Sequence, residues 1–501
     1  MFIWSFLRRH HTGRWWQLLR RAVAGSILSL LLITGCQPFK PKERPLHQDV
    51  PKQFSLYSGD VEQGHRWWVR FRDPELNRLI ESALADNFSI QEAWARLRQS
   101  RALAVQAGAG RYPDLTGSAD YLKGRQHSES LGDGSFEFED AGLGLVSRYE
   151  IDLWGRVRAR HRSVLLQAEA SRQDLNTAAV TIAAEVADRW IGILSQRMQL
   201  ALLKEQLRIN RTLLELVELR FRNALVSALD VYQQKQVVEN VLAEIPLVEQ
   251  EEQLLMHQLA VLLGKPPRAE LGITRGKLPE PTPLPPTGLP ADMLASRPDV
   301  VAAGLRLQAA DWQIAEARAN RLPTLSLTGR AQYGDGDLEV LFDNWLLTLA
   351  ANLTLPIIDG GSRRAEVDRT RAVADENLAA YRDAVYTAVK EVEDALVRET
   401  KQKAHIERLQ QAADTARRAL EEAGVRYRKG LNDYLPVLTQ LLSVQNLERD
   451  LIRKQAGLLT ARIGLYRALG GSWPNALEMP DPEKAGGNRT EMREAGTRAH
   501  D

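Results

Sequence analysis

An internal duplication constrains the fold of this chain more than any other feature of its sequence. RYPDLTGSADY at 111–121 resembles RLPTLSLTGRAQY at 321–333. LRFRNALVSALDV at 219–231 resembles VRYRKGLNDYLPV at 425–437, and the two members of each pair are separated by a similar length of chain. Because both pairs occur in the same order, we expect two copies of one structural unit.

A proline-rich segment, KLPEPTPLPPTGLP at 277–290, separates the two copies. Its prolines exclude it from a helix or a central strand, so it is expected to be an extended linker. The repeat units then occupy 67–276 and 291–473. Each begins with one helix, near 74–110 and 291–320, which ends where a proline excludes the preceding residue from helical geometry.

After these prolines the hydrophobic period changes to two, which predicts β-hairpins at 113–153 and 323–358. In LSLTGRAQY, at 325–333, apolar or small residues alternate strictly with polar ones. The strands therefore have one apolar face and one polar face. The polar face of the first hairpin carries three charged residues, Arg148, Glu150 and Asp152.

The strand pattern favours an outer-membrane β-barrel over a soluble β-sandwich, which would show the same alternation. The strands are about ten residues long and end in aromatic residues, as barrel strands do. Two hairpins supply four strands, whereas the smallest closed barrels have about eight. Because lipid cannot satisfy unpaired strand edges, other copies of the chain must complete the barrel. Arg148, Glu150 and Asp152 would then line its watery pore.

Each β-hairpin is followed by a long stretch without strong helix breakers, which predicts helical hairpins at 155–264 and 361–470. At 1.5 Å per residue each outgoing helix would reach roughly 100 Å, far beyond the membrane. Asn210 occupies one position of an otherwise apolar heptad seam, typical of a coiled coil. Pro246 is expected to bend or interrupt the first returning helix. The apolar members of the seam are Leu200, Leu203, Leu207, Leu214, Val217 and Phe221.

The N-terminus, 1–35, has the pattern of a bacterial export signal. Arginines without acidic residues precede an apolar stretch of about a dozen residues, which is too short to span a bilayer. The following ITGC, which ends at Cys36, resembles the lipobox of bacterial lipoproteins, whose cysteine takes a lipid and becomes the new N-terminus. We therefore expect a lipid anchor at Cys36 and a lipid-anchored extension at 36–66. Gln37 points, by the same resemblance, to the outer membrane.

Motifs of enzymes, metal sites and cofactor sites are missing from the sequence. The P-loop, zincin and α/β-hydrolase patterns do not occur. Of the nine histidines, His10 and His11 fall in the predicted signal and the others are scattered. The 66 basic and 64 acidic residues give no global positive field for nucleic acid. We expect no catalytic activity, metal, cofactor or nucleic acid. The polar, breaker-rich C-terminus, 474–501, is expected to be disordered.

YEIDLWGRVR, at 149–158, resembles the strand-to-helix signature of the TolC/OprM outer membrane factor family, particularly its NodT-like lipoprotein branch in resistance-nodulation-division (RND) efflux systems. The resemblance covers nearly the whole mature chain. It implies a mainly α fold with a small membrane β part. Three chains would form a twelve-stranded outer-membrane β-barrel, continued by a long periplasmic α-helical barrel.

The function implied by this resemblance is a passive exit duct for drugs, metal ions or other toxic solutes. An inner-membrane RND pump would supply the energy, and a periplasmic adaptor (membrane fusion protein) would join pump and duct. The protein would be anchored in the outer membrane and project into the periplasm.

The resemblance also assigns roles to the turns between the long helices. Asp230 and Tyr427 match a hydrogen-bonding pair that holds the family's tunnel shut, and Leu435 matches an apolar constriction. Pro436 and Thr439 stand where relatives carry acidic residues, so we expect a leucine ring to close the aperture. The implied adaptor contacts are Arg222, Asn223, Leu225, Arg428, Gly430 and Leu431.

Three other functions remain compatible with parts of the sequence. A lipid-anchored periplasmic adaptor also has a helical hairpin, but only one. A trimeric structural coiled coil would lack a pore. A TolC-like duct for type I protein secretion would keep the fold and change the cargo.

Overall fold

The computed structural model describes residues 38–41, 51–55, 66–128, 134–281, 283–285, 287–288, 290–336, 338–471 and 473–478. The predicted export signal and Cys36 lie outside these residues, as does the predicted tail from 479 onward. The chain forms two compact units, and each draws on both sequence repeats. The first unit contains Gln99–Ala168 and Leu305–Ala379, and the second contains Glu169–Gly304.

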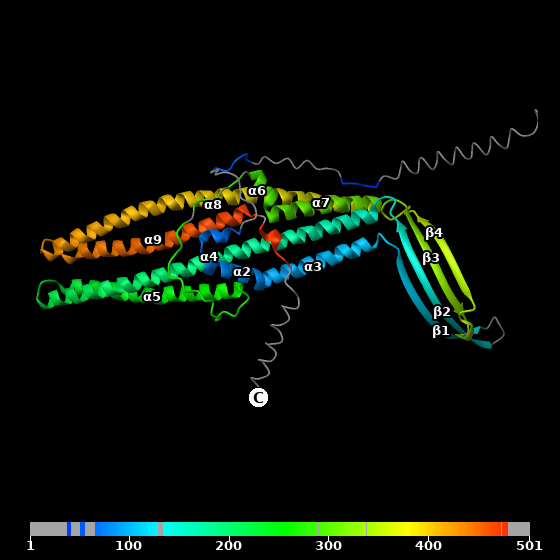
Figure 1. Ribbon diagram of the computed structural model, residues 1–501, viewed down its shortest axis with the longest axis horizontal. Coiled ribbons are helices and arrows are strands. Elements are labelled where there is room, and N and C mark those ends of the chain that lie inside the picture. The colour runs from blue at the N-terminus through cyan, green and yellow to red at the C-terminus, as the bar shows by residue number, and fades with distance from the viewer. Residues whose placement is uncertain are drawn as a thin grey trace, which may run out of the picture. The chain divides into compact units, whose positions relative to one another are not determined.

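Four long helices account for about half of the described chain, as expected of a mainly α protein (Figure 1). α4 (Arg156–Arg222) and α5 (Ala228–Leu262) form the first helical hairpin. α8 (Ser362–Arg428) and α9 (Tyr434–Leu469) form the second. Both hairpins begin and end within a few residues of the predicted positions.

Of the two outcomes expected at Pro246, a bend or an interruption, the interruption does not occur, because α5 continues through this proline. Proline removes one backbone hydrogen bond from a helix. In a helix of 35 residues, packing along the remaining length maintains the helical path, since most helical stability in proteins comes from tertiary packing.

The single helix expected at the start of each repeat is two helices in the structure. In the first repeat, α2 (Pro74–Asp86) and α3 (Phe88–Ala109) are separated at Asn87. The Asn87 side-chain oxygen accepts hydrogen bonds from the backbone N–H groups of Ser89 and Ile90, which caps α3.

The second repeat breaks at the equivalent place by a different means. α6 (Pro290–Ser296) and α7 (Pro298–Ala319) are separated at Arg297. Pro298 disfavours helical geometry in the residue before it, so α6 ends there and α7 begins with the proline.

The two β-hairpins form one antiparallel sheet with strands in the order β1–β2–β3–β4 (Figure 1). The strands are β1 (Asp114–Ser128), β2 (Gly134–Ile151), β3 (Thr324–Asp335) and β4 (Trp345–Thr354), and a short 3₁₀ helix, η3 (Leu338–Val340), lies between the last two. β1 and β2, at 15 and 18 residues, exceed the expected length of about ten. The first hairpin extends beyond the second, and this extension pairs only with itself.

The strand register gathers the apolar residues of all four strands on one face. Leu145 of β2 pairs with Gly117 of β1 and with Ala331 of β3, and Ala331 pairs with Leu347 of β4. Directly opposed residues share a face, so this row is apolar or small across the whole sheet. Leu347 and its same-face neighbour Leu349 are 70% and 83% exposed. The predicted division into an apolar and a polar face is confirmed.

In the second unit, aromatic side chains pack the N-terminal segment against α9. Trp67 of η1 (Trp67–Phe71) stacks on Tyr466, with ring centroids 5.2 Å apart. Trp68 meets Trp473 edge to face at 4.8 Å. Phe54 is also buried, in a cluster formed largely by α8 and α9.

The expectation of disorder from 474 onward is wrong for the first residues of that range. Trp473–Ala476 forms a short 3₁₀ helix, η4. Arg172 of α4 donates hydrogen bonds to the backbone carbonyls of Asn475 and Leu477. Trp473 and Pro474 are buried, so apolar packing and these hydrogen bonds order the segment.

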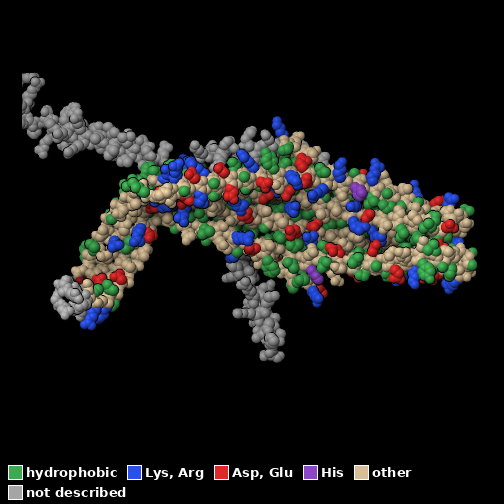
Figure 2. Space-filling model, turned by 180° about the vertical axis from the view of Figure 1, so that it is seen from behind, with side chains coloured by type: hydrophobic (Ala, Val, Ile, Leu, Met, Phe, Trp, Pro, Cys, Tyr) green, Lys and Arg blue, Asp and Glu red, His purple; other side chains and the backbone are tan. Residues whose placement is uncertain are grey.

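The helices carry a mixed, polar surface. On the face drawn in Figure 2, acidic and basic side chains are interspersed over the helical part of the chain. Within the part of the chain that the structure describes, no helix is both long enough and apolar enough to cross a membrane.

Candidate functional site

The three predicted pore-lining residues differ in their structural roles. Arg148 lies on the polar face of β2, opposite Thr328, and is exposed. Glu150 shares this face, but its carboxylate accepts hydrogen bonds from Nε and Nη2 of Arg156, at 2.9 and 2.5 Å. Asp152 lies beyond the end of β2. The prediction of a strand position for Asp152 is therefore wrong.

Asp152 begins the helix that follows the strand. Its two carboxylate oxygens accept hydrogen bonds from the backbone N–H groups of Val157 and Arg158, both at 3.0 Å. These N–H groups have no partner within the first turn of a helix, and a carboxylate there also interacts favourably with the helix dipole. The DLWGR segment thus converts a strand into a long helix over a few residues.

Residues near the N-terminus also contact the turn in this segment. Trp154 donates a hydrogen bond from Nε1 to the carbonyl of Pro323, at 2.8 Å, and accepts one at its own carbonyl from the Phe39 N–H, at 3.2 Å. Gly155 has φ of 76°, and a Cβ there would lie 2.8 Å from Cβ of Pro38. Glycine is required at this position both for the backbone conformation and for the close approach.

The turns between the long helices have the same hydrogen-bond pattern in both repeats. In the first, the N–H groups of Leu225 and Ala224 donate to the carbonyls of Arg220 and Phe221. In the second, Leu431 and Gly430 donate to Arg426 and Tyr427. This pair of bonds is the Schellman motif, which needs a left-handed residue after the helix. Gly430 has φ of 71° and Ala224 has φ of 56°, so alanine occupies the glycine position of the first repeat.

All six predicted adaptor contacts lie at these two turns and are exposed. Leu225 and Leu431, each 64% exposed, occupy equivalent positions of the two turns. Asn223 donates a hydrogen bond from Nδ2 to the carbonyl of Leu219, at 2.7 Å, which helps to end α4. Arg222 and Arg428 are the last residues of α4 and α8, where a positive charge interacts favourably with the helix dipole.

The predicted hydrogen bond between Asp230 and Tyr427 is not formed. Asp230 forms a capping box with Ser227, whose N–H donates to the Asp230 carboxylate at 2.9 Å and whose hydroxyl accepts from the Asp230 N–H at 3.3 Å. The Tyr427 hydroxyl is buried and has no hydrogen-bond partner among the described residues. Its ring instead lies under the guanidinium of Arg220, 4.3 Å from the centroid. Burial raises the pKa of the Tyr427 hydroxyl.

The two turns between the long helices are the tips of the helical hairpins. Leu435 lies in the first turn of α9, next to the second tip, which joins α8 and α9. Its side chain is 57% exposed and borders a surface hollow that Asn432 and Pro436 also line. Thr439 donates its hydroxyl hydrogen to the carbonyl of Leu435 at 2.9 Å. An exposed apolar side chain at this position can meet an identical side chain from another copy.

A buried polar network near the tips was not predicted, although Asn210 was singled out in the coiled-coil seam. The Tyr434 hydroxyl donates to Oε1 of Gln234 at 2.6 Å, and Nε2 of Gln234 donates to the carbonyl of Asn210 at 2.9 Å. Nδ2 of Asn210 donates to Oε1 of Gln445 at 3.3 Å. The network joins α4, α5 and α9 through side chains that are almost completely buried. Asn210, a polar residue in an otherwise apolar heptad seam, was the only feature of the sequence that indicated this network.

Among the residues that the structure describes, histidine, cysteine, aspartate and glutamate do not gather into a cluster that could hold a metal ion.

Comparison with known proteins identifies the family. The family model for outer membrane efflux proteins matches the chain twice, at 79–265 and 289–471. The chain is 31% identical over 465 residues to the pyoverdine export outer membrane protein OpmQ of Pseudomonas aeruginosa, which covers 89% of this chain and 96% of OpmQ. It is also 31% identical over 414 residues to outer membrane protein OprJ of Pseudomonas aeruginosa, covering 81% and 86% of the two chains.

Solved structures agree with this assignment. The chain superimposes on the outer-membrane channel OprN with a TM-score of 0.81 and 27% identity, over 87% of this chain and 99% of OprN. For the outer membrane protein VceC of Vibrio cholerae the TM-score is 0.77 and the identity 28%, over 82% and 100% of the chains. The chain therefore belongs to the outer membrane efflux protein family, has the TolC-like fold, and is the outer-membrane channel component of an efflux pump.

Proposed function

We propose that three copies of this chain assemble into the exit duct of a tripartite RND-type efflux pump. Their sheets close a twelve-stranded barrel in the outer membrane, and their helical hairpins continue it as a tunnel through the periplasm. The duct is passive, because the pump supplies the energy. The observation that carries the proposal is the continuous apolar face of the four-stranded sheet, exposed in the single chain.

The edges of the sheet support closure by other copies. Within the described residues, β1 pairs only with β2, and β4 pairs only with β3, so both outer strands present unpaired backbone groups. Such edges are costly in lipid, and pairing β4 of one copy with β1 of the next removes them. Four strands per chain and three chains give a barrel within the size range of outer-membrane proteins.

A lipid anchor at Cys36 is compatible with the position of the residues that follow it. Phe39 bonds to Trp154, at the end of the sheet where β2 passes into α4. We propose that the lipid inserts in the periplasmic leaflet of the outer membrane.

The partners are proposed to be an inner-membrane RND pump and a periplasmic adaptor that contacts the two tips through Arg222, Asn223, Leu225, Arg428, Gly430 and Leu431. The names of similar proteins indicate small organic cargo: OpmQ is a pyoverdine exporter, and TtgF of Pseudomonas putida is the outer membrane protein of a toluene efflux pump. These names favour efflux of small solutes over type I protein secretion.

Closure of the tunnel is proposed to depend on Leu435. Three such side chains would form an apolar ring that excludes water. Asp230 contributes by fixing the start of α5 through its capping box, and Tyr427 by packing between the helical hairpins. Arg148 and Glu150 would face the pore of the barrel.

A matched pair of lysine substitutions on β4 tests the barrel. Leu349 lies on the apolar face, and Asn352 lies on the polar face opposite Ser326. Leu349→Lys should prevent stable insertion, since a lysine on the lipid face of a barrel costs about 2–4 kcal/mol at the bilayer midplane. Asn352→Lys should insert normally. The measurements are heat-resistant trimers on denaturing gels and ion conductance in planar bilayers.

Equal insertion of both variants would contradict the assignment of the apolar face to lipid. A purified wild-type protein that stays a water-soluble single chain would contradict the duct itself. For the gate, Leu435→Ser should raise the conductance of reconstituted trimers, and unchanged conductance would remove Leu435 from the constriction.

A further inference from the structure

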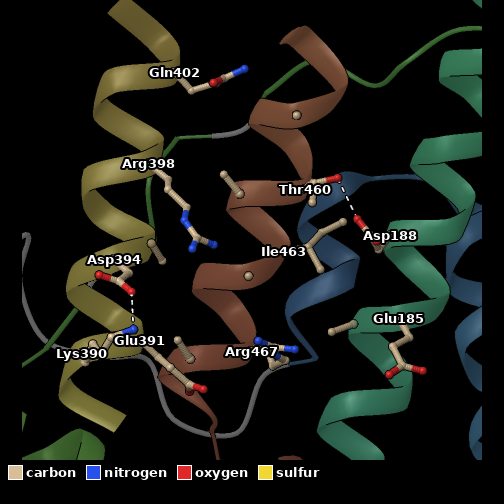
Figure 3. Close-up of a pocket in the computed structure, with 16 residues that line it drawn as sticks. Glu185, Asp188, Lys390, Glu391, Asp394, Arg398, Gln402, Thr460, Ile463 and Arg467 are labelled. Atoms are coloured by element: carbon tan, nitrogen blue, oxygen red, sulfur yellow. Dashed lines mark hydrogen bonds and ion pairs between the residues drawn. The ribbon is translucent and has the colours of Figure 1, made fainter. Parts of the chain in front are cut away.

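A groove in the second unit lies across α4, α8 and α9 and has no role in the function proposed above. It has a volume of about 540 Å³ and is partly open to solvent. Figure 3 shows the side chains that line it. This volume lies within the usual range of small-molecule sites, about 300–1,000 Å³. Its charged lining residues are Glu185, Asp188, Lys390, Glu391, Asp394, Arg398 and Arg467.

The groove exists because α9 presents small residues along its floor. Gly457, Ala461, Gly464 and Ala468 follow one another at spacings of four and three residues, which places them on one side of the helix. A Cβ at Gly464 would have no neighbour within 4 Å, and one at Gly457 would lie 3.2 Å from Nε2 of Gln402. Longer side chains at these positions would fill the space between α4 and α8.

Most carboxylates of the groove already have partners. Glu391 forms an ion pair with Arg297 at 2.8 Å, and Asp394 forms one with Lys390 at 2.7 Å. Asp188 accepts a hydrogen bond from the Thr460 hydroxyl at 2.7 Å (Figure 3). Asp188 also forms an ion pair with Arg189 at 3.4 Å, so the protein supplies a cation for each of these three carboxylates.

Two guanidinium groups are left over. Arg398 of α8 and Arg467 of α9 border the groove, and neither side chain makes an ion pair or hydrogen bond among the described residues. In Figure 3 the Arg398 side chain extends from α8 toward α9. Its charge helps the hydrogen bond from Lys390 to hold the pKa of Asp394 below the usual value. Opposite them, Glu185 of α4 is the one lining carboxylate without such a partner in the described chain.

We propose that this groove binds a small organic anion that carries two or more carboxylate groups. Guanidinium groups bind carboxylates through paired hydrogen bonds, and two of them on neighbouring helices can hold two carboxylates of one molecule. Glu185 opposes binding and keeps the affinity low enough for release.

The position of the groove connects it to transport, and this step rests on the proposed function. Trp67 and Phe71 pack on Tyr466, which covers α9 on the side away from the groove, and Figure 3 shows the N-terminal helical segment behind the space between α9 and α4. If three copies close a ring of helices, the concave face of each copy surrounds the axis of the ring. The groove makes the face formed by α4, α8 and α9 concave. The groove then lies in the tunnel wall, and the cargo that it contacts is a polycarboxylate.

Citrate is a suitable probe, and its binding to the purified full-length protein in detergent can be measured by isothermal titration calorimetry at low salt. Arg398→Gln and Arg467→Gln should each raise the dissociation constant about tenfold, as expected for loss of a charge-assisted hydrogen bond. Glu185→Gln should lower it. Arg453→Gln is the control, because Arg453 is on α9, pairs with Asp450 and does not line the groove.

Equal citrate affinity in all four variants, or no binding by the wild type, would overturn the proposal. Loss of the trimer in Arg398→Gln or Arg467→Gln would assign the groove to contacts between copies and would also overturn it. Failure of the wild type to form trimers or channels would instead contradict the proposed function, and the citrate titration remains interpretable in that case.

Discussion

Arg462 of α9 and Glu399 of α8 form an ion pair in which both side chains are almost completely buried, at 6% and 4% exposure. Nη1 of Arg462 also donates a hydrogen bond to the carbonyl of Pro283, at 2.7 Å. The same guanidinium thus joins the two helices of the second hairpin and holds the proline-rich linker between the repeats. Arg197 of α4 holds the chain just before the linker in a similar way, because its Nη1 donates hydrogen bonds to the carbonyls of Ile273 and Arg275.

Removal of the negative charge from this pair should strongly destabilise the protein. Glu399→Gln removes the carboxylate that pairs with the buried Arg462 guanidinium, and removal of one partner of a buried ion pair typically costs about 3–5 kcal/mol. Asp450→Asn breaks the exposed pair with Arg453 and should change stability by at most about 1 kcal/mol. Thermal unfolding in detergent, followed by far-ultraviolet circular dichroism, compares the two. Similar melting temperatures would show that the buried pair contributes no more than a surface pair.

The two helical tips predict opposite effects of exchanging alanine and glycine. Ala224 is left-handed, a conformation that costs a residue with a Cβ about 1–2 kcal/mol, so Ala224→Gly should stabilise the first tip. Gly430→Ala places a Cβ in the same conformation at the second tip and should destabilise it by a similar amount. Hydrogen exchange at the tips measures both changes locally. Effects of the same sign at the two tips would contradict the explanation.

Several parts of the fold could be predicted from the sequence because they depend on local patterns. The alternation of apolar and polar residues after the Arg-X-Pro segments predicted where the strands lie. In the structure, the strand register aligns Leu145, Ala331 and Leu347 in one row. The helix breaks at Asn87 and Arg297 were missed, since hydrophobic periodicity continues across a break that a single residue causes.

The site residues were harder to predict because their roles depend on competing hydrogen bonds. Asp152 and Asp230 carry charge at positions that suggest a pore and a gate, yet both carboxylates bond to nearby backbone N–H groups at helix starts. A sequence does not show which of two available partners a carboxylate takes. Tyr427 lacks its expected partner for the same reason.

Tyr427→Phe should not open the channel, because the hydroxyl group holds no partner within the described chain. An unpaired buried hydroxyl typically costs about 1–3 kcal/mol, so the variant should be as stable as the wild type or more stable. Arg220→Ala removes the cation from the Tyr427 ring and should loosen the tip instead. Conductance in planar bilayers is the measurement. Raised conductance in Tyr427→Phe would show that the hydroxyl bonds to another copy in the closed trimer.

The ion pair between Asp299 and Arg297 predicts a loss of stability in acid. Burial by itself raises the pKa of Asp299, but the hydrogen bonds and charge of Arg297 outweigh it, so the pKa lies below its ordinary value of 3.8. A depressed pKa of the folded state stabilises the protein above the unfolded-state pKa, and the contribution is lost as the pH falls through the folded-state pKa. Asp299→Asn should therefore be less stable than the wild type at neutral pH.

The melting temperatures of the wild type and Asp299→Asn should converge as the pH falls below the folded-state pKa of Asp299, because the carboxyl group is then protonated in both the folded and the unfolded wild type. Added salt should reduce their difference at neutral pH, since the Asp299 side chain is 37% exposed. A constant difference across the whole pH range would show that the substitution acts through packing and not through charge.

The buried network around Asn210 predicts coupling between the two helical hairpins. Asn210→Ala removes the Nδ2 group that donates to Oε1 of Gln445, and a buried group left unpaired typically costs about 1–3 kcal/mol. Gln234 keeps its hydrogen bond to the backbone carbonyl at position 210. Gln445→Ala removes the partner on α9, so the double variant has fewer unpaired groups than the two single variants together. The summed losses of stability in the two single variants should therefore exceed the loss in the double variant, because residues of one hydrogen-bond network are energetically coupled.

Leu203→Ala, a buried apolar change elsewhere on the same seam, is the control and should combine additively with Gln445→Ala. Thermal unfolding of the four-member cycle measures the coupling. Additive losses in the Asn210 cycle would mean that the hairpins are held in register by apolar packing alone and that the polar residues merely fill the seam.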